Sequence, residues 1–588
     1  MHEPQRPAPP PGGSEAALEP ADPVPRTGAR RYWIHLALLV ALALAMYLFR
    51  LGSADWEDDL EAEGPQIIQE MLRGTGWILP LSNGRNIPLK PSLYHWLGAA
   101  SAMLRGSGLD RLDARLPSAL LATLCVVLVY LFARRHADER AALWAGLILL
   151  TTPQFLIEAR NSRVDMVMCG FLTAGLLLAH RVWEGQSSRA TAVGAGLCIA
   201  LATLAKGPLA LALVVLVFAT TALIARPAPG WRVLLSPATL AAALVPPVAW
   251  YAAATWQLGL PFLQVQLFGE NVSRITGGLG YRPPWYYVGP LFAGGLPWML
   301  LLPWTAAGSS RLAARPRRFL WAWCIAMFVL FSASPGKRQA YLLPLRPALA
   351  ILLGAWIAPR LAGLRGAPRA VGVPRAAQAV LGGLVVAAVA GVVALRFGIG
   401  GFGASQLEWG YWWRTYLDAH FPTALALIVG VGIGMYVIVV ALVRRRIEIA
   451  GYALAATLAW GLTLAVAAAA MVRGDGGSVE GFAHDVLAQL GPDERLAFFY
   501  TDDRQHLGLL FHLHRQLPVV EPVSEQAPCT PPQPGAYLIP VAQWTDRSCF
   551  RGGGWTEVLR GGPAIGAERG QWLVLARYGG KANAPAAP

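Results

Sequence analysis

Apolar segments long enough to cross a lipid bilayer recur along most of this chain, from residues 34–50 to residues 451–472. A helix needs about 20 mainly apolar residues to cross the ~30 Å hydrocarbon core of a membrane. The chain has 588 residues, of which 55% are hydrophobic and only 14% charged, and its mean hydropathy is +0.44. A soluble domain needs a more highly charged surface. The sequence therefore predicts an integral membrane protein built mainly from helices.

The basic residues show which way the chain is inserted. Arginines gather in alternate short connections between the apolar segments, which is the positive-inside pattern. They are Arg26, Arg30, Arg31, Arg134, Arg135, Arg226, Arg232, Arg311, Arg315, Arg317, Arg318, Arg360, Arg365, Arg369, Arg375, Arg444, Arg445 and Arg446. This distribution places the N-terminus in the cytoplasm, and it explains the net charge of +15 without a nucleic-acid partner.

Following this alternation gives about thirteen spans, an odd number that puts the C-terminal region outside. The expected spans are residues 34–50, 116–133, 141–158, 164–182, 191–205, 208–225, 234–255, 287–307, 319–333, 341–358, 376–395, 423–443 and 451–472. The connections 51–115 and 256–286 are long and external. The apolar segment 91–104 is too short to span, so we expect an interfacial or re-entrant helix there.

Three regions follow from this division. Residues 1–31 form a Pro-rich cytoplasmic tail that we expect to be disordered. Residues 32–472 form the transmembrane domain. We expect residues 473–588 to form a small external α/β domain. Its sequence predicts an amphipathic helix at Val479–Leu490 and strands at Leu496–Tyr500, Ala536–Val541 and Trp572–Tyr578. The expected fold is thus an all-α polytopic membrane protein with a small α/β domain at its C-terminus.

The six cysteines divide by location. Cys125, Cys169, Cys198 and Cys324 lie inside apolar spans, where they are packing residues. Cys529 and Cys549 both lie in the external domain, where an oxidising compartment favours a disulfide. No Cys and His residues have the spacing of zinc ligands.

Ionisable residues gather at the outer ends of the spans. Each has an ordinary explanation: a solvated loop for the acidic segment, stabilisation of a helix N-terminus for a carboxylate, and a snorkelling side chain for a lysine. Together, however, the topology places them at one face of one bundle, which indicates a functional site. They are Asp58, Asp59, Lys90, Asp165, Lys206, Arg274 and Lys337, with Arg160 and Arg163 in the turn before Asp165 and Arg338 beside Lys337.

The order of these motifs resembles the GT-C glycosyltransferases that use polyprenyl-phosphate sugars, namely the aminoarabinose transferases acting on lipid A and the protein O-mannosyltransferases. The resemblance covers residues 34–358, and the bacterial aminoarabinose branch fits best. The matching motifs are the acidic cluster with Glu70-Met71-Leu72, Trp77-Ile78-Leu79-Pro80 with Asn83-Gly84, Lys90-Pro91 with Leu93-Tyr94-His95-Trp96, Arg115-Leu116-Pro117, Ala159-Arg160 with Asp165-Met166, Lys206-Gly207-Pro208, Glu270-Asn271 with Arg274, and Tyr341-Leu342-Leu343-Pro344.

The resemblance implies a GT-C fold and a periplasm-facing site in the bacterial inner membrane. It implies that Lys90 and Lys206 hold the departing phosphate, assisted by Arg160, Arg274 or Lys337, and that Glu270 and Tyr94 also contact the donor. It further implies that Asp59 or Asp58 takes a proton from an acceptor hydroxyl or orients it, and that Asp165 matches a second functional acid. If the acceptor is itself a phosphate, no base is required, and the carboxylates instead bind the sugar or position cations. A single displacement at the anomeric carbon inverts its configuration.

The chain departs from the family pattern at Leu89, where an acidic residue is usual, and at Ser92, which replaces a proline. These departures leave the sugar and the acceptor open: lipid A, another envelope glycan or a protein. A requirement for a divalent metal is also open. The alternative from another class is a transporter or flippase for the lipid-linked sugar. Transporters commonly show repeated halves with binding near the bilayer midplane, whereas this chain has no duplicated half and its ionisable residues lie at one face.

Overall fold

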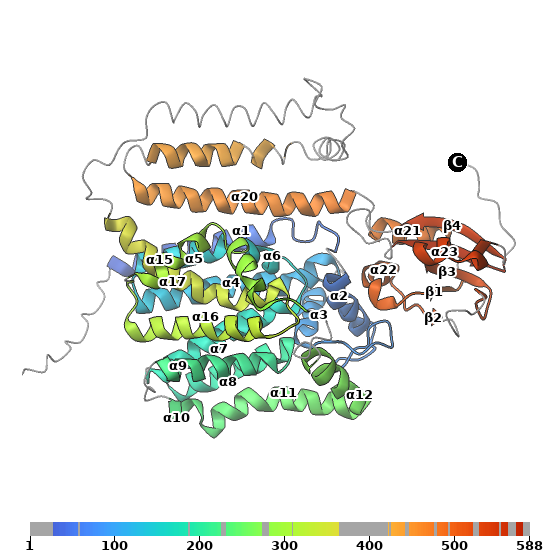
Figure 1. The fold of residues 1–588 in the computed structure, drawn as a ribbon, viewed down its shortest axis with the longest axis horizontal. Helices are drawn as coiled ribbons and strands as arrows, with labels where there is room; N and C mark the ends of the chain where they lie inside the picture. Colours follow the sequence, from blue (N-terminus) through green and yellow to red (C-terminus); the bar gives the residue numbers. More distant parts are fainter. Residues whose placement is uncertain are drawn as a thin grey trace, which may run out of the picture.

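The computed structural model describes residues 27–56, 59–106, 108–185, 188–224, 231–272, 281–308, 310–363, 422, 425–427, 429–441, 446–475, 479–491, 494–520, 529–551, 554–561 and 572–579. Residues 1–26 of the expected disordered tail and the expected span 376–395 lie outside these residues, whereas residues 27–31 of that tail are helical. Figure 1 shows a bundle of long helices with a small α/β domain at one end.

Six helices in the described part are long and apolar enough to cross a membrane, which makes this a multi-pass membrane protein. They are α1 (Thr27–Leu48), α4 (Arg111–His136), α7 (Val164–Trp183), α8 (Arg189–Lys206), α11 (Pro237–Leu258) and the segment Gln339–Ala362, which contains the 3₁₀ turn Gln339–Leu345 and most of α17 (Arg346–Gly363). The further helices α9 (Leu209–Ile224), α16 (Ala314–Ala333) and α20 (Ile447–Asp475) match three more expected spans.

Two expected spans are broken. Residues 141–158 form two helices, α5 (Glu139–Leu150) and α6 (Pro153–Ala159), whose axes are bent by 65° at the short break between them. The helix does not continue through Pro153, because proline has no backbone N–H to donate to the preceding turn. The expected span over residues 287–307 is not one continuous helix. The structure has instead a succession of short pieces: Pro284–Tyr287, α14 (Val288–Ala293), Trp298–Leu301 and α15 (Leu302–Ala307). Pro290, Pro297 and Pro303 with the pair Gly294-Gly295 interrupt the apolar run, and length and hydropathy do not detect this.

The external connection 51–115 contains two helices. α3 (Leu93–Arg105) occupies the place of the expected interfacial helix, while α2 (Asp59–Leu72) was not expected. The next helix, α4, starts at a capping box: the Asp110 side chain accepts from the backbone N–H of Asp113, and the Asp113 side chain accepts from that of Asp110. These reciprocal bonds satisfy N–H groups that a helix start leaves unpaired. They fix where the chain leaves the external layer and enters the bundle.

The C-terminal domain contains a five-stranded sheet in the order β2-β1-β3-β5-β4. Its strands are β1 (Leu496–Phe499), β2 (Val519–Val520), β3 (Gly535–Pro540), β4 (Trp555–Gly561) and β5 (Leu573–Tyr578), and its helices include α21 (Val479–Gln489), α22 (Leu507–Leu513) and α23 (Val541–Asp546). β1 pairs in parallel with β2 and β3, and β5 pairs antiparallel with β3 and β4. The expected helix and three expected strands are present.

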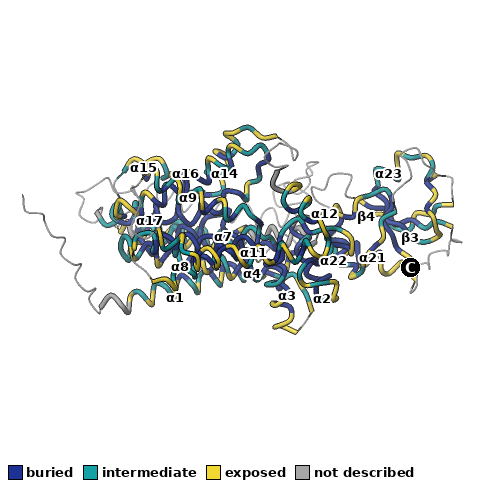
Figure 2. Tube along the Cα trace, turned by 90° about the horizontal axis from the view of Figure 1, so that it is seen from below, coloured by how far each residue is buried: buried dark blue, intermediate teal, exposed yellow. Residues whose placement is uncertain are grey.

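Alternation along the strands gives this sheet two apolar faces. One face, with Leu496, Phe498, Leu538 and Leu575, belongs to a core that also contains Trp56 of the external connection. The other face, with Phe499, Tyr537, Ile539 and Val574, packs against Phe550 and Cys529. The first face therefore joins the domain to the membrane part, as the continuous buried colour between α22 and α2 in Figure 2 also shows.

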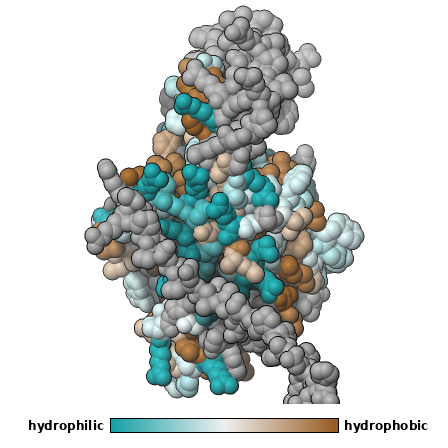
Figure 3. Space-filling view, turned by 90° about the vertical axis from the view of Figure 1, so that its left-hand side faces the viewer, coloured by the Kyte–Doolittle hydropathy of each residue, from teal (hydrophilic) through white to brown (hydrophobic). Residues whose placement is uncertain are grey.

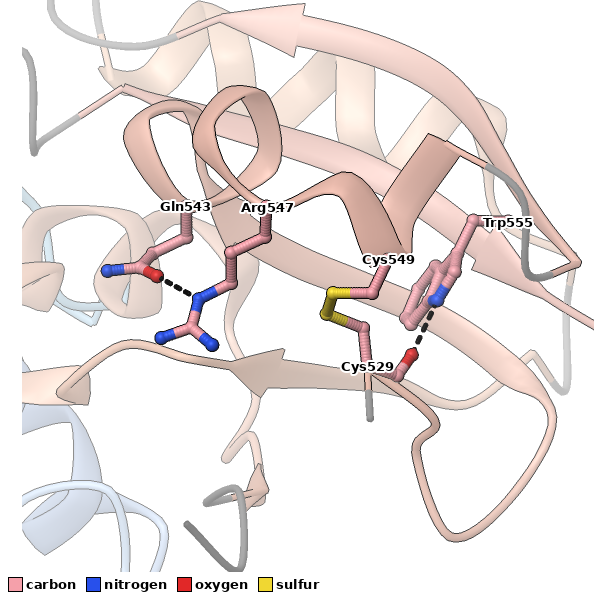
Figure 4. The surroundings of a disulfide bond; sticks show 5 residues. All are labelled: Cys529, Gln543, Arg547, Cys549 and Trp555. Atoms are coloured by element: carbon pink, nitrogen blue, oxygen red, sulfur yellow. Dashed lines mark hydrogen bonds between the residues drawn. A yellow bond between two sulfur atoms is a disulfide. The ribbon is translucent and has the colours of Figure 1, made fainter. Parts of the chain in front are cut away.

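Cys529 and Cys549 form a disulfide across the second face, with their Cα atoms 5.6 Å apart. Figure 4 shows the bond beside Trp555, whose indole N–H donates to the carbonyl of Cys529 at 2.7 Å. The four other cysteines are free, and three of them are buried.

Candidate functional site

A cavity of about 470 Å³ lies where α2 and α3 meet the starts of α7 and α9. Four cationic and two anionic side chains line it, within otherwise apolar walls. They are Lys90, Arg163, Lys206, Arg338, Glu63 and Asp165. This excess of positive charge in a partly apolar space suits a ligand that carries an anionic group and a hydrocarbon chain.

Lys206 and Asp165 form the central ion pair of this cavity. Lys206 is the last residue of α8 and Asp165 lies in the first turn of α7, and the Lys206 ammonium donates to Asp165 Oδ1. Both side chains are largely buried. The ammonium also lies 4.9 Å from the centre of the Tyr341 ring, a cation–π distance. Two neighbours thus fix the position of this cation, and one of them is a carboxylate with which any anionic ligand must compete.

Lys90 and Tyr94 enter the cavity from the start of α3. The Tyr94 hydroxyl donates to the carbonyl of Ala114 at 2.7 Å, and burial raises the pKa of this phenol, so it remains a neutral donor. Gly64 permits the close approach of α2 to this ring, because a Cβ at that position would lie 2.4 Å from Tyr94 Cε1. The ring fixes the contact between α2 and α3, and with it one wall of the cavity.

The remaining expected site residues either do not line this cavity or have side chains that the structure does not describe. Arg160 donates to the carbonyls of Met46 and Tyr47 at 2.9 and 3.1 Å, and Lys337 donates to the carbonyls of Arg282, at 3.1 Å, and Ser334. Neither lines the cavity. Asp59 begins α2 and Glu270 lies in the helical turn Gln264–Val272, but their side chains are not described. Asp58 and Arg274 lie outside the described residues.

The acidic connection before α2 is held from the membrane side by Arg115. Its guanidinium pairs with Glu61, with Nε 2.9 Å from Oε1, and donates to the carbonyls of Leu51, Ala54 and Asp55. Both side chains of the pair are almost fully buried. The Arg115-Leu116-Pro117 motif therefore serves to fix the segment that leads to Asp58 and Asp59.

The C-terminal domain holds the same connection from the other side. Asp55 Oδ1 lies 3.0 Å from His512 Nε2, and the Trp56 ring meets Phe511 edge-on with centroids 5.0 Å apart. Although burial alone would raise the pKa of Asp55, the His512 imidazole and the backbone N–H groups of Trp56 and Glu480 hold it below its usual value. The domain thus contacts the acidic connection close to the expected catalytic carboxylates.

The Asn83-Gly84 motif is a second anchor for this domain. Asn83 adopts a positive φ of 51°, a conformation that asparagine tolerates better than most residues. Its amide donates to Asp503 Oδ2 at 2.6 Å and to the carbonyl of Leu517 at 2.9 Å, and its Oδ1 accepts from the Leu517 N–H. Asn86 and Arg85 also reach Asp503, which is fully buried. The side chains of Asn83, Arg85 and Asn86 therefore bind the Asp503 carboxylate, and Asn83 also binds the backbone of Leu517.

Four lining residues had no role in the site predicted from the sequence: Glu63, His95, Arg163 and Arg338. Arg163 and Arg338 stand within two residues of expected site residues, and which neighbour faces the cavity depends on packing that the sequence does not show. His95 is buried, and this burial lowers its pKa to about 3, so the ring is neutral.

Within the described residues, no group of three or more His, Cys, Asp or Glu side chains lies close enough to hold a metal ion.

Residues 89–256 match the family model for dolichyl-phosphate-mannose-protein mannosyltransferases. The chain is 30% identical over 348 residues to an undecaprenyl phosphate-alpha-4-amino-4-deoxy-L-arabinose arabinosyl transferase of Pseudomonas fluorescens, a match covering 56% of this chain and 61% of the relative. A relative of the same name from Shewanella sediminis is 31% identical over 345 residues, covering 55% and 60%. The matches to these curated relatives thus span about three fifths of their length.

The fold is that of a solved enzyme. The crystal structure of ArnT from Cupriavidus metallidurans bound to undecaprenyl phosphate superposes with a TM-score of 0.70 and 23% identity, covering 94% of this chain and 98% of that one. Its structure in the apo state gives the same TM-score. These matches confirm the expected GT-C fold, although not the expected number of thirteen spans.

Proposed function

Because this chain belongs to the GT-C glycosyltransferase superfamily of aminoarabinose transferases and protein O-mannosyltransferases, we propose that it transfers a sugar from undecaprenyl phosphate to an envelope acceptor, with lipid A as the preferred acceptor. The similar proteins from Pseudomonas fluorescens and Shewanella sediminis are named for an undecaprenyl-phosphate-linked aminopentose. The observation that carries the proposal is the cavity that brings Lys90, Lys206, Arg163 and Arg338 together.

These cations meet the main electrostatic demand of the reaction. Breaking the bond between the anomeric carbon and the phosphate oxygen places negative charge on the departing lipid phosphate, and fixed positive groups stabilise that charge most in the transition state. Lys90 and Lys206 act as compact charges, and Arg163 and Arg338 present planar donors suited to phosphate oxygens. The apolar lining, with Leu209, Leu267 and Leu330, receives the start of the prenyl chain.

The carboxylates take two roles in this proposal. For an acceptor hydroxyl, Asp59 or its neighbour Asp58 accepts the proton or orients the hydroxyl for attack on the face opposite the departing phosphate, which inverts the anomeric configuration. For an acceptor phosphate no base is required, and the two carboxylates instead bind the sugar or position cations. Asp165 positions the Lys206 ammonium, with which it is already paired. Glu270, Arg274 and Tyr94 complete the donor site, and Arg160 and Lys337 support it by fixing the backbone around it.

The finer topology is also proposed. Thirteen spans place the N-terminus in the cytoplasm and both the cavity and the C-terminal domain in the periplasm of a bacterial inner membrane. This arrangement brings the polar end of the donor to the external face while its lipid stays in the bilayer.

A protein acceptor is the second candidate, because the matching family model is named for protein mannosyltransferases. A transporter of the intact lipid-linked sugar is the third. Purified protein in nanodiscs, supplied with undecaprenyl-phosphate aminoarabinose and either lipid A or a serine-rich peptide, separates the three. We expect release of undecaprenyl phosphate and a matching mass gain on lipid A. A mass gain on the peptide alone identifies the second candidate, and movement of intact donor across vesicles without release contradicts glycosyl transfer.

A further inference from the structure

A second cavity, of about 650 Å³, lies at the end of the bundle opposite the candidate site. It opens between the C-terminal halves of α4 and α7 and the start of α5. Its polar lining consists of Arg134, Arg135, Arg181, Asp138 and Glu139. Figure 3 shows hydrophilic residues gathered at the centre of this end of the molecule, with hydrophobic residues around them.

The two carboxylates of this cavity are already engaged. Asp138 caps α5 by accepting from the Ala141 N–H at 2.8 Å, and it lies 3.5 Å from the guanidinium of Arg311. Glu139 lies 3.1 Å from His35 Nδ1. Three arginines line the cavity against two carboxylates, one of which also lies beside Arg311, so the cavity has an excess of positive charge.

The surroundings of two of these arginines favour an anionic ligand. The Arg134 guanidinium lies 4.1 Å from the centre of the Tyr32 ring, which orients it by a cation–π contact. Arg181 Nε is buried and has no hydrogen-bond partner among the described residues. A buried donor without a partner is costly, and an anionic oxygen in the cavity would satisfy it.

The rest of the wall is hydrocarbon. Leu128, Leu131, Leu177 and Leu178 line the cavity, and Leu131 is 38% exposed on the side of the bundle. Because α4 and α7 are both spans, this side faces the acyl chains of the bilayer. Positive charge at the membrane surface thus adjoins an apolar wall that leads into the lipid.

We infer that this cavity binds the phosphate headgroup of an anionic phospholipid in the leaflet opposite the candidate site, with one acyl chain along Leu131 and Leu178. Basic pockets between spans bind lipid headgroups by this combination of charge and hydrocarbon. Ordinary snorkelling of arginines to the membrane surface would account for the charge alone. If snorkelling were the whole explanation, replacing Arg134 or Arg181 would affect lipid binding no more than replacing another arginine at the same end of the bundle.

Native mass spectrometry of the purified full-length protein, titrated with phosphatidylglycerol or phosphatidylcholine, tests this inference. The test variants are Arg134→Gln and Arg181→Gln, and the matched control is Arg189→Gln, an exposed arginine at the start of α8 outside the cavity lining. We expect phosphatidylglycerol to bind the wild type more tightly than phosphatidylcholine, and each test variant to lose about fivefold in affinity, while the control keeps it.

Leu178→Trp is a second test that keeps every charge. It fills the apolar wall and should also reduce phosphatidylglycerol binding, which guards against arginine variants that fail to fold. Equal loss in Arg189→Gln overturns the inference, as does equal binding of the two lipids by the wild type. Inorganic phosphate should not compete with phosphatidylglycerol; displacement by phosphate alone would show a site for the free anion and contradict the lipid assignment.

Discussion

Asp55, in the connection after α1, and His512, in α22, are 457 residues apart in the chain, yet their buried side chains are in contact, with Oδ1 and Nε2 3.0 Å apart. Through this contact the C-terminal domain reaches a point four residues from Asp59. We interpret the C-terminal domain as fixing the position of the acidic connection through this contact and through Asn83. Arg115 fixes the same connection from the transmembrane domain.

The first prediction concerns pH. Since the folded-state pKa of Asp55 is lowered, the ionised carboxylate stabilises the docked domain at pH values above its unfolded pKa of about 4. This contribution is lost as the pH falls through the lowered folded pKa. Asp55→Asn should lower the free energy of unfolding by about 1–3 kcal/mol at pH 7, and its difference from wild type should shrink towards pH 3. Thermal unfolding followed by tryptophan fluorescence measures this, and a difference that grows as the pH falls would contradict the assignment.

The second prediction concerns the anchor at Asn83. Asp503→Ala removes the acceptor shared by Asn83, Asn86 and Arg85, so buried donors lose their partner, at a cost of about 1–3 kcal/mol. Hydrogen exchange should then quicken in residues 79–90 and 507–517 and little elsewhere in the domain. Asp502→Asn is the matched control, because that neighbouring carboxylate is exposed and only caps a local turn. Unchanged exchange in Asp503→Ala would show that the anchor does not hold the domain.

The third prediction separates the two faces of the sheet. The bond between Cys529 and Cys549 closes a loop with a sequence separation of 20, for which the chain-entropy model gives about 3 kcal/mol. Replacing both cysteines by serine should lower the unfolding temperature of the C-terminal domain. Sugar transfer at low temperature should persist, because the bond lies on the face away from Trp56. Loss of transfer in protein with an intact fold would place the disulfide face in the active assembly.

The fourth prediction concerns insertion. Asp546 lies in the C-terminal domain and is exposed, so a cysteine introduced by Asp546→Cys should react with a membrane-impermeant thiol reagent in intact spheroplasts. Labelling that requires lysis would place this domain, and the cavity beside it, on the cytoplasmic side.

The sequence predicted most of this fold where one physical signal dominates. Length and hydropathy located α1, α4, α7, α8 and α11, and short apolar runs between Gly/Pro turns located β1, β3 and β5. The missed strands carry weak signals: β2 has only two residues, and β4 lies at a sheet edge with its side chains half-buried or exposed. Neither strand has the run of buried residues that β1, β3 and β5 have.

The site was predictable to the level of motifs but not of neighbours. Lys90, Asp165 and Lys206 line one cavity, as the topology suggested, and so does Tyr94, which the family resemblance implied. Sequence could not choose between Lys337 and Arg338, since the choice depends on which side of the turn after α16 faces α7. It also could not show that Arg115 and Asn83-Gly84 bind structural partners, because those partners lie far away in the chain or in its backbone.

The most direct test of the central claim is single-turnover release of undecaprenyl phosphate by equal amounts of folded wild type, Lys206→Gln, Lys90→Gln and Asp165→Asn. Each lysine variant removes a charge that stabilises the departing phosphate, so its rate should fall by about 10²–10³-fold. Asp165→Asn should fall less if its role is to position Lys206. Arg189→Gln, an exposed arginine remote from the cavity, should release the lipid phosphate at the wild-type rate. Near-normal rates in both lysine variants would show that the cavity does not hold the reacting phosphate.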